Sequence, residues 1–288
     1  KKFYVMLISF KEILLDACRH GYAVGAFNCL SIENVMGAIQ AAEDLRSPII
    51  LQLAEIQFPY APLEMMAPVF LKAAKGASVP VAVHLDHGLS YETCARAIGL
   101  GFGSVMFDGS GYPLEENIRQ TRGVVRMAHA FGTNVEAELG RVGNAEEAAA
   151  PVPSTADVCT DVGEAVRYVE QTGADALAIA IGNMHGWYVA TPQLNIARLK
   201  EIHARLNLPL VLHGGSGTSD ADFKACIHHG IGKINVATAL QVEITKEIRL
   251  YLSENDRPDY MEMKRRMTAA TKHAVSKHIL LFESDNRA

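Results

Sequence analysis

Short apolar stretches, many of them rich in β-branched residues, alternate along the chain with longer stretches in which apolar positions recur every three or four residues. The short stretches are typical of buried strands and the long ones of amphipathic helices. The pattern predicts strands over residues 22–28, 48–54, 79–86, 103–108, 133–138, 175–181, 209–213 and 233–236. It predicts helices between them over residues 32–45, 63–75, 91–100, 115–131, 162–172, 196–206, 219–229 and 237–252.

Eight strand–helix pairs whose strands are apolar throughout predict an α/β fold, a parallel sheet covered by helices and closed into a (β/α)8 TIM barrel. An apolar patch that runs into amphipathic residues 12–19 predicts an additional N-terminal helix that caps the barrel. The chain after Arg257 predicts a C-terminal helical tail against the barrel or a neighbouring subunit. We expect residues 1–288 to form a single domain.

Unusual polar residues stand where the predicted strands pass into loops. The C-terminal strand ends form the active-site face of a (β/α)8 barrel, so residues far apart in the sequence converge there. The pattern therefore predicts one shared pocket. Its candidate residues are Asn28, Asp86, His87, Asp108, Glu138, His185, His213 and Asn235.

Three of these candidates, His87, His185 and His213, are histidines followed directly by glycine. Three imidazoles with an open fourth position are typical of catalytic Zn²⁺ sites. Glycine beside each of them allows close approach of the backbone. These histidines are the predicted zinc ligands, whereas His84 is expected to lie in the core or behind the ligands.

Carboxylates beside the predicted metal site are candidates for moving protons. Asp86 can take the proton of a substrate hydroxyl or return it; the alternative is that it only orients a ligand or caps the following helix. Asp108 and Glu138 are candidates for a second or alternative metal site. Glu136, on the same side of its strand as Glu138, is a further candidate for this site, with structural hydrogen bonding as the alternative.

Glycine-rich and helix-start segments after the seventh and eighth predicted strands are candidates for holding phosphate. Backbone N–H groups in such segments bind anions, and these two loops are the usual phosphate site of the barrel. The segments predict a phosphorylated small-molecule substrate. The residues expected to contact it are Asn28, Gly186, Gly214, Gly215, Ser216, Asn235, Ala237 and Thr238.

The overall composition excludes several other classes. A net charge of −5 argues against a nucleic-acid-binding or acidic-membrane surface, and no apolar run approaches the ~20 residues of a membrane helix. Five widely spaced cysteines without a C-x-x-C pair favour reduced thiols and a cytoplasmic location. Residues 140–160 are too long for an ordinary turn and predict a mobile flap.

The motifs around these residues resemble the class II fructose- and tagatose-bisphosphate aldolases over nearly the full chain. The resemblance rests on residues 26–28, 84–88, 105–110, 136–140, 182–186, 212–217 and 233–238. It implies zinc-dependent cleavage of a ketose phosphate to dihydroxyacetone phosphate and an aldehyde. It also implies zinc ligation by His87, His185 and His213. We further expect a homodimer or homotetramer and a monovalent cation near the phosphate.

The resemblance further implies roles for single residues. Asp86 serves the substrate hydroxyls, Asn235 helps to stabilise the enediolate, and Glu146 in the flap handles the proton of the carbon that becomes a carbanion. Glu147 is the adjacent alternative. Lys233 as a Schiff-base lysine would be the rival mechanism, but the histidine set makes such a lysine unnecessary.

The chain departs from the family's pattern where basic or hydroxyl groups are usual. It has Asn183 where Thr is usual, Val189-Ala190 where a Lys is usual, and Arg257-Pro258-Asp259 in place of Asp-Pro-Arg. These departures predict a substrate with phosphate at C1 but a neutral or carboxylate group at its far end. The alternative is that another basic side chain binds a second phosphate: Arg141 in the flap, Lys264, Arg265 or Arg266 in the tail, or a residue of a neighbouring subunit. The alternatives left open are a metal-dependent sugar-phosphate epimerase or isomerase and a noncatalytic sugar-phosphate-binding protein.

Overall fold

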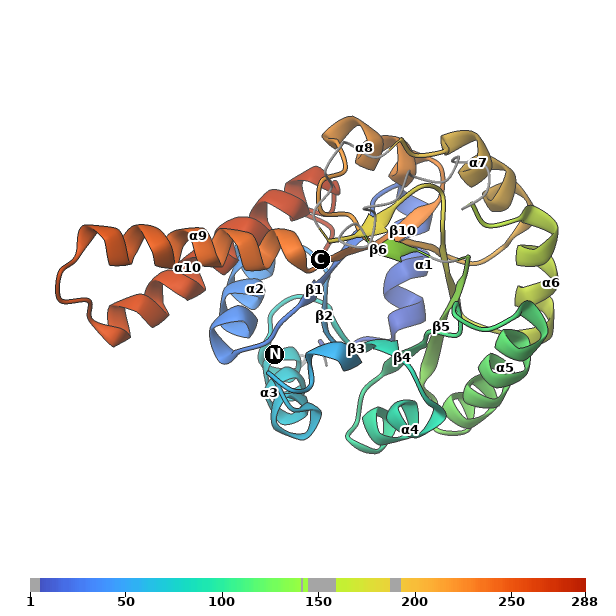
Figure 1. The fold of residues 1–288 in the computed structure, drawn as a ribbon, viewed down its shortest axis with the longest axis horizontal. Coiled ribbons are helices and arrows are strands. Elements are labelled where there is room, and N and C mark those ends of the chain that lie inside the picture. Colours follow the sequence, from blue (N-terminus) through green and yellow to red (C-terminus); the bar gives the residue numbers. More distant parts are fainter. Residues whose placement is uncertain (1–5, 141, 145–158, 187–192) are drawn as a thin grey trace.

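The structure is a computed structural model that describes residues 6–140, 142–144, 159–186 and 193–288. Its centre is a closed barrel of parallel strands in the order β1-β10-β9-β7-β5-β4-β3-β2, so the first strand pairs with the last (Figure 1). The predicted (β/α)8 barrel is confirmed. The barrel strands are β1 (Val24–Asn28), β2 (Ile49–Ala54), β3 (Val81–Gly88), β4 (Ser104–Phe107), β5 (Asn134–Leu139), β7 (Ala176–Ile179), β9 (Leu210–Leu212) and β10 (Ile231–Val236).

Helices follow the strands and surround the barrel (Figure 1). Each predicted helix is present, and the ends differ from the prediction by no more than two residues. Side-chain caps fix several of the starts, for example Ser31, Ser90 and Asp161. The helices are α1 (Phe10–His20), α2 (Ile32–Asp44), η1 (Glu55–Gln57), α3 (Leu63–Gly76), α4 (Tyr91–Gly99), α5 (Leu114–Ala130), α6 (Val162–Thr172), α7 (Ile196–Arg205), α8 (Asp220–His228), α9 (Thr238–Glu254) and α10 (Tyr260–Leu281).

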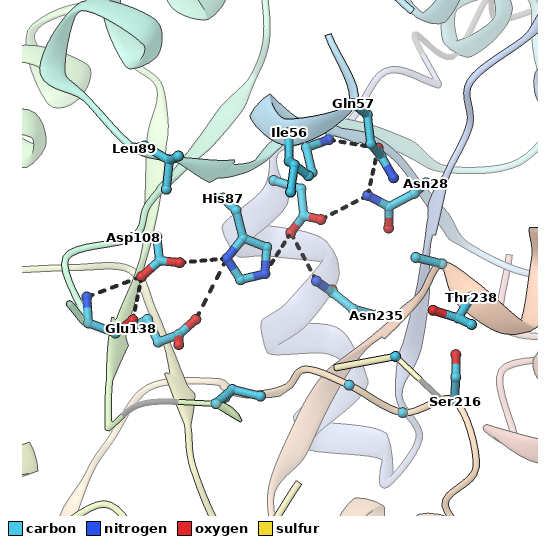
Figure 2. A pocket seen from close by; sticks show the side chains of 18 of the residues that line it. Asn28, Ile56, Gln57, His87, Leu89, Asp108, Glu138, Ser216, Asn235 and Thr238 are labelled. Carbon is cyan, nitrogen blue, oxygen red and sulfur yellow. Dashed lines mark hydrogen bonds and ion pairs between the residues drawn. The ribbon is translucent and has the colours of Figure 1, made fainter. Parts of the chain in front are cut away.

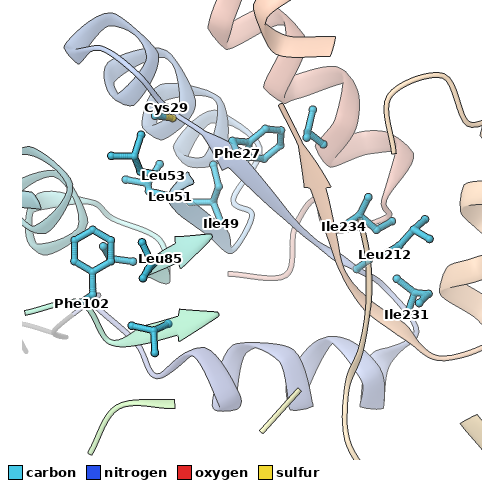
Figure 3. Close-up of a cluster of buried hydrophobic side chains, with 14 of the residues drawn as sticks. Phe27, Cys29, Ile49, Leu51, Leu53, Leu85, Phe102, Leu212, Ile231 and Ile234 are labelled. Carbon is cyan, nitrogen blue, oxygen red and sulfur yellow. The ribbon is translucent and has the colours of Figure 1, made fainter. Parts of the chain in front are cut away.

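Alternate side chains along each strand point to opposite faces of the barrel wall, so one set packs against the helices and the other fills the barrel interior. The outward side chains, such as Leu51, Leu85 and Leu212, form a hydrophobic layer with the surrounding helices (Figure 3). Side chains at the alternate positions point into the barrel. Both faces of each strand are buried, which is why the strands read as continuous apolar runs in the sequence.

The lower barrel interior is filled by the N-terminal helix. Phe10 and Leu14 of α1 are fully buried and pack against small inward side chains such as Ala26, Ala82 and Ala178. The small residues leave the room that α1 occupies. The predicted helical cap therefore closes the N-terminal end of the barrel, and the site residues are confined to the opposite end.

The predicted C-terminal tail is one long helix, α10, which folds back on α9 and packs against α2. Gly37 of α2 permits this approach, since a Cβ there would lie 2.5 Å from the carbonyl oxygen of Thr268. The far end of the α9–α10 hairpin projects well away from the barrel (Figure 1). Of the helices in the described part of the chain, none is long and apolar enough to cross a membrane.

A second sheet was not predicted. Two short strands, β6 (Gly143–Asn144) and β8 (Met184–His185), pair in parallel just beyond β5 and β7. The pairing joins the start of the predicted flap to the segment that carries His185.

Candidate active site

A cavity of about 790 Å³ opens at the C-terminal end of the barrel strands. It is lined by residues from loops and strand ends that lie far apart in the sequence. Most of the predicted site residues meet here (Figure 2). Those that line the cavity are Asn28, Asp86, His87, Asp108, Glu138, Gly186, Gly214, Gly215, Ser216, Asn235, Ala237 and Thr238.

Four predicted site residues stand apart from this list. His213 is fully buried and does not line the cavity. The backbone of His185 lies in β8, opposite Asn144, but its side chain belongs to the part of the chain that is not described. Glu146 and Glu147, both in the flap, lie outside the described residues.

A local irregularity in β3 brings two consecutive side chains into the same pocket. The register between β3 and β4 shifts between Leu85 and Gly88, and His87 has a positive φ of 40°. Non-glycine residues rarely adopt this conformation, and bulges of this kind redirect side chains next to functional sites. Gly88 is required beside it, because a Cβ there would lie 2.8 Å from the carbonyl oxygen of Met106.

Two imidazole nitrogens face each other at the centre of the site. Nε2 of His87 lies 2.8 Å from Nδ1 of His213. The other nitrogen of each ring is held by a carboxylate: Nδ1 of His87 by Asp108 at 2.8 Å and Nε2 of His213 by Glu136 at 2.7 Å. Metal-binding histidines typically donate their second ring N–H to a carboxylate, which turns the other lone pair toward the metal. The donor set therefore fits a divalent metal ion.

Nearby carboxylates extend this donor set. Among the described residues, Asp86, His87 and His213 form one group with ligand atoms close enough to hold a metal ion. His87, Asp108 and Glu138 form a second group. The geometry thus offers two overlapping positions for a cation, both of which include His87.

Asp86 is held by two side-chain amides. Asn28 donates to its Oδ2 at 2.8 Å and Asn235 to its Oδ1 at 2.9 Å, so β1 and β10 together fix the carboxylate of β3 (Figure 2). Gln52 in turn donates to Oδ1 of Asn28 at 2.9 Å. That contact turns the NH₂ of Asn28 toward Asp86.

Burial and neighbouring charges shift the pKa values of Asp86, His87 and Glu138 in the pocket. Burial raises the pKa of Asp86, but His87, His213, Lys233 and Asn28 outweigh it and lower the pKa to about 2. Burial lowers the pKa of His87, yet the neighbouring carboxylates raise it to about 10. Burial and then Asp108 raise the pKa of Glu138 to about 8. The surplus of carboxylates gives the pocket a strong affinity for a positive charge, whether proton or metal ion.

The opposite wall of the pocket presents backbone instead of charged side chains. Gly214 and Gly217 have φ of 65° and 103°, so the loop after β9 folds tightly across the start of α9. Oγ of Ser216 accepts from the backbone N–H of Ala239 at 3.0 Å and caps this helix. A glycine loop beside a helix N-terminus is suited to bind an anion.

No lysine or arginine of the described chain lines the cavity. The basic residues of the tail are paired elsewhere: Lys264 with Glu33, Arg265 with Glu262, and Arg266 with Glu247 and Glu262. Asp259, from the altered Asp-Pro-Arg segment, caps α10 on the projecting hairpin.

The unusual Asn183 is fixed away from the cavity. Its Oδ1 accepts from the backbone N–H of Ile181 at 2.8 Å, and its Nδ2 donates to the carbonyl oxygen of His213 at 2.9 Å. It therefore positions the backbone that carries His213 and is not available as a phosphate contact. Val189-Ala190 and Arg141 lie outside the described residues.

Sequence reasoning missed the roles of several residues. Gln52 and Lys233 are fully buried inside the barrel, and Glu136 contacts both Lys233 and His213. Each lies two positions before a residue of the pocket wall on the same strand: Ala54, Asn235 and Glu138. This spacing of two is the signal by which they could have been found.

Comparison with known proteins places the chain in a family. A family model described as fructose-bisphosphate aldolase class-II matches residues 8–287. The chain belongs to this family. The resemblance stated from the sequence motifs is thereby confirmed, and so is the general class of lyase.

Members of the aldolase family from several organisms match the chain over nearly its full length. A probable fructose-bisphosphate aldolase of Bacillus subtilis is 40% identical, with 98% of this chain and 99% of that protein covered. The crystal structure of the YdjI aldolase from Escherichia coli K12 superposes with a TM-score of 0.88 at 35% identity, covering 98% and 99% of the two chains. A putative fructose-1,6-bisphosphate aldolase from Coccidioides immitis has a TM-score of 0.84 at 32% identity, with 96% of each chain covered.

Proposed function

We propose that the chain is a zinc-dependent aldolase that cleaves a ketose 1-phosphate to dihydroxyacetone phosphate and an aldehyde. The observation that carries the proposal is the pair of facing nitrogens on His87 and His213, each backed by a carboxylate, directly beside the amide-held Asp86. Family membership and the backbone-lined anion site support the same reaction.

His87 and His213 would hold the metal ion together with His185. Zn²⁺, when bound, would supply a Lewis acid at the substrate carbonyl. Asp108 and Glu136 keep the two rings oriented through their second nitrogens. Asn235 contributes an N–H donor beside the metal position, where negative charge develops on the substrate oxygens.

Asp86 would act as the base for cleavage. Its low pKa keeps the carboxylate ionised through the neutral range, and each oxygen retains a lone pair beside the amide it accepts from. It accepts the proton of the C4 hydroxyl as the C3–C4 bond breaks. The electron pair of that bond stays on the C3 side, and C4 leaves as the carbonyl carbon of the aldehyde.

A second acid is needed to return a proton to C3. We assign this step to Glu146, with Glu147 as the neighbouring alternative, because Val142, near the start of the flap that carries them, lines the cavity. Asp86 would then accept the proton of the C4 hydroxyl, and the flap glutamate would donate the proton to C3.

The loop after β9 and the start of α9 would bind the C1 phosphate through backbone N–H groups, with Ser216 and Thr238 at its edge. The described pocket has no cationic side chain for a second phosphate. Each missing charge-assisted hydrogen bond would weaken binding by about 1.5–3 kcal/mol. A neutral or carboxylate far end is therefore favoured over a bisphosphate.

The test is to incubate the purified chain with a panel of ketose mono- and bisphosphates and to assay for dihydroxyacetone phosphate, with and without a zinc chelator. Release of two fragments that stops on chelation and returns with Zn²⁺ supports the proposal. A single rearranged sugar would instead show an epimerase or isomerase. Light scattering will show whether the chain forms the homodimer or homotetramer that we expect.

A further inference from the structure

Lys233 is the one fully buried lysine in the part of the chain that the structure describes. It points into the barrel from β10, and its Nζ lies 2.8 Å from Oε2 of Glu136, which has no solvent exposure either. Beneath the pair, the ring of Phe10 excludes water, with the ammonium 5.9 Å from its centre. Lys233 is thus an ionic group in the core and not a surface residue.

Stability does not explain such a pair. Removing two charges from water costs several kcal/mol for each ion, and buried ion pairs are often no better than well-packed apolar residues of similar volume. The neighbouring interior positions of the barrel show that apolar residues are accommodated there, since Ala178 and Val211 are equally buried. The pair has to be understood through what it holds in place.

Glu136 links Lys233 to the centre of the site. One of its oxygens faces the ammonium, and the other contacts Nε2 of His213 at 2.7 Å. The opposite nitrogen of His213, Nδ1, faces His87 at 2.8 Å. A continuous chain of contacts therefore runs from Lys233 through Glu136 and the ring of His213 to the candidate metal position.

We propose that Lys233 is a positioning residue for the metal centre. By holding Oε2 of Glu136, the ammonium aims Oε1 at Nε2 of His213 as a pure acceptor. The ring then carries its hydrogen on Nε2 and turns the lone pair of Nδ1 toward the metal. Without the ammonium, Oε2 has no cationic partner and the carboxylate is free to rotate toward His84, whose Nε2 lies 3.5 Å away.

The inference rests on the proposed function, because it assumes that His213 binds metal. It differs from that proposal in what it predicts for Lys233, which touches neither the substrate pocket nor the metal position. It also replaces the rival idea of Lys233 as a Schiff-base lysine, since the amine is sealed inside the barrel and already paired with Glu136.

The experiment measures Zn²⁺ affinity of the full chain by competition with a chromophoric chelator, alongside the Co²⁺ absorption spectrum and the thermal unfolding of the metal-free protein. Lys233→Met should bind Zn²⁺ about 10–100-fold more weakly, the range typical of lost partners behind a metal ligand. Its Co²⁺ spectrum at saturation should also change. Lys11→Met is the control, because it removes the ion pair with Asp175 at the other end of the barrel.

Lys233→Met leaves an unpaired buried carboxylate, so a second variant guards against misfolding. The double variant Lys233→Met/Glu136→Gln removes both charges. The neutral amide at position 136 can contact His213 through either its oxygen or its NH₂ group. It should fold and still bind Zn²⁺ at least about tenfold more weakly than wild type. Wild-type affinity and Co²⁺ spectrum in either folded variant, even with a lowered melting temperature, would overturn the inference. A wild-type chain that binds no Zn²⁺ would instead refute the proposed function.

Discussion

His87 follows Asp86 directly in the chain, yet both side chains enter the same pocket, because the bulge in β3 gives His87 a left-handed backbone conformation. Consecutive residues of a regular strand would point to opposite faces. The bulge thus places a candidate base next to a candidate metal ligand. Replacement of Gly88 by alanine would press on the carbonyl of Met106 and disturb this arrangement.

The metal assignment predicts a loss of binding for His213→Ala. The variant should bind Zn²⁺ at least about 100-fold more weakly, since even residues behind a ligand contribute 10–100-fold. Chelation of the wild-type chain should abolish activity without unfolding it, because the barrel does not need the metal to form its core. Metal analysis and circular dichroism measure the two effects. Full zinc occupancy in His213→Ala would contradict the assignment.

Asp86→Ala should lower kcat by roughly 10²–10⁴-fold, the usual contribution of a positioned base. Zinc should remain bound, because the histidines and their carboxylate partners are intact in the variant. Steady-state kinetics with metal analysis of the same sample separates the two roles. An inactive variant that has also lost its zinc would show that Asp86 serves the metal rather than the proton.

The pKa of Asp86 predicts a specific acid sensitivity. Its value falls from 3.8 to about 2 on folding, so the carboxylate stabilises the fold fully above pH 3.8 and loses this effect as pH falls through about 2. The shift corresponds to about 2–3 kcal/mol. Urea unfolding of metal-free protein across this window should show a steeper loss of stability for wild type than for Asp86→Ala. Parallel curves would contradict the shift.

The flap glutamate is tested by proton exchange. Glu146→Ala should exchange the proton on dihydroxyacetone phosphate roughly 10²-fold more slowly or worse, while Glu147→Ala, one residue away, should exchange at the wild-type rate. Exchange into deuterated solvent is followed by NMR. The reverse pattern would move the role to Glu147, and wild-type exchange in both variants would remove it from this pair.

The described part of the pocket has no lysine or arginine side chain, which predicts a preference for ketose 1-phosphates. Matched 1-phosphates and 1,6-bisphosphates should differ in kcat/KM by about one to two powers of ten per missing contact, in favour of the monophosphate. A gain of charge offers a complementary test: Ile56→Arg, at the rim of the cavity, should raise kcat/KM for the bisphosphate. A wild-type bisphosphate preference above about tenfold would restore the ordinary bisphosphate reaction.

The barrel and the rim of the site were predictable from sequence, because each strand is an apolar run and its polar end residue interrupts that run. Asp86, His87 and Asn235 were found in this way. The partners of Glu136 and Lys233 were not, since contacts across a barrel depend on how strands tilt and register, which the local sequence does not encode. The β6–β8 pair is too short to leave a pattern.

Two further details needed the structure. Asn28 and Asn235 were expected to contact substrate, and both line the cavity, but their nearest task is to hold Asp86 from two sides. Asn183 looked like a lost phosphate contact, whereas it braces the backbone of His213. A side-chain amide gives no hint in sequence of which carbonyl or carboxylate it will meet.

Asp86 is clamped by the first and the last strand of the barrel, which meet at a single seam. The clamp therefore cannot form before the seam closes, because Asn28 and Asn235 lie 58 and 149 positions from Asp86 in the sequence, on opposite sides of it. Such long-range pairing is slow compared with local helix formation. Catalytic activity should consequently return last during refolding, after helix content and the burial of apolar side chains. The time course of activity recovery would then report when β1 pairs with β10.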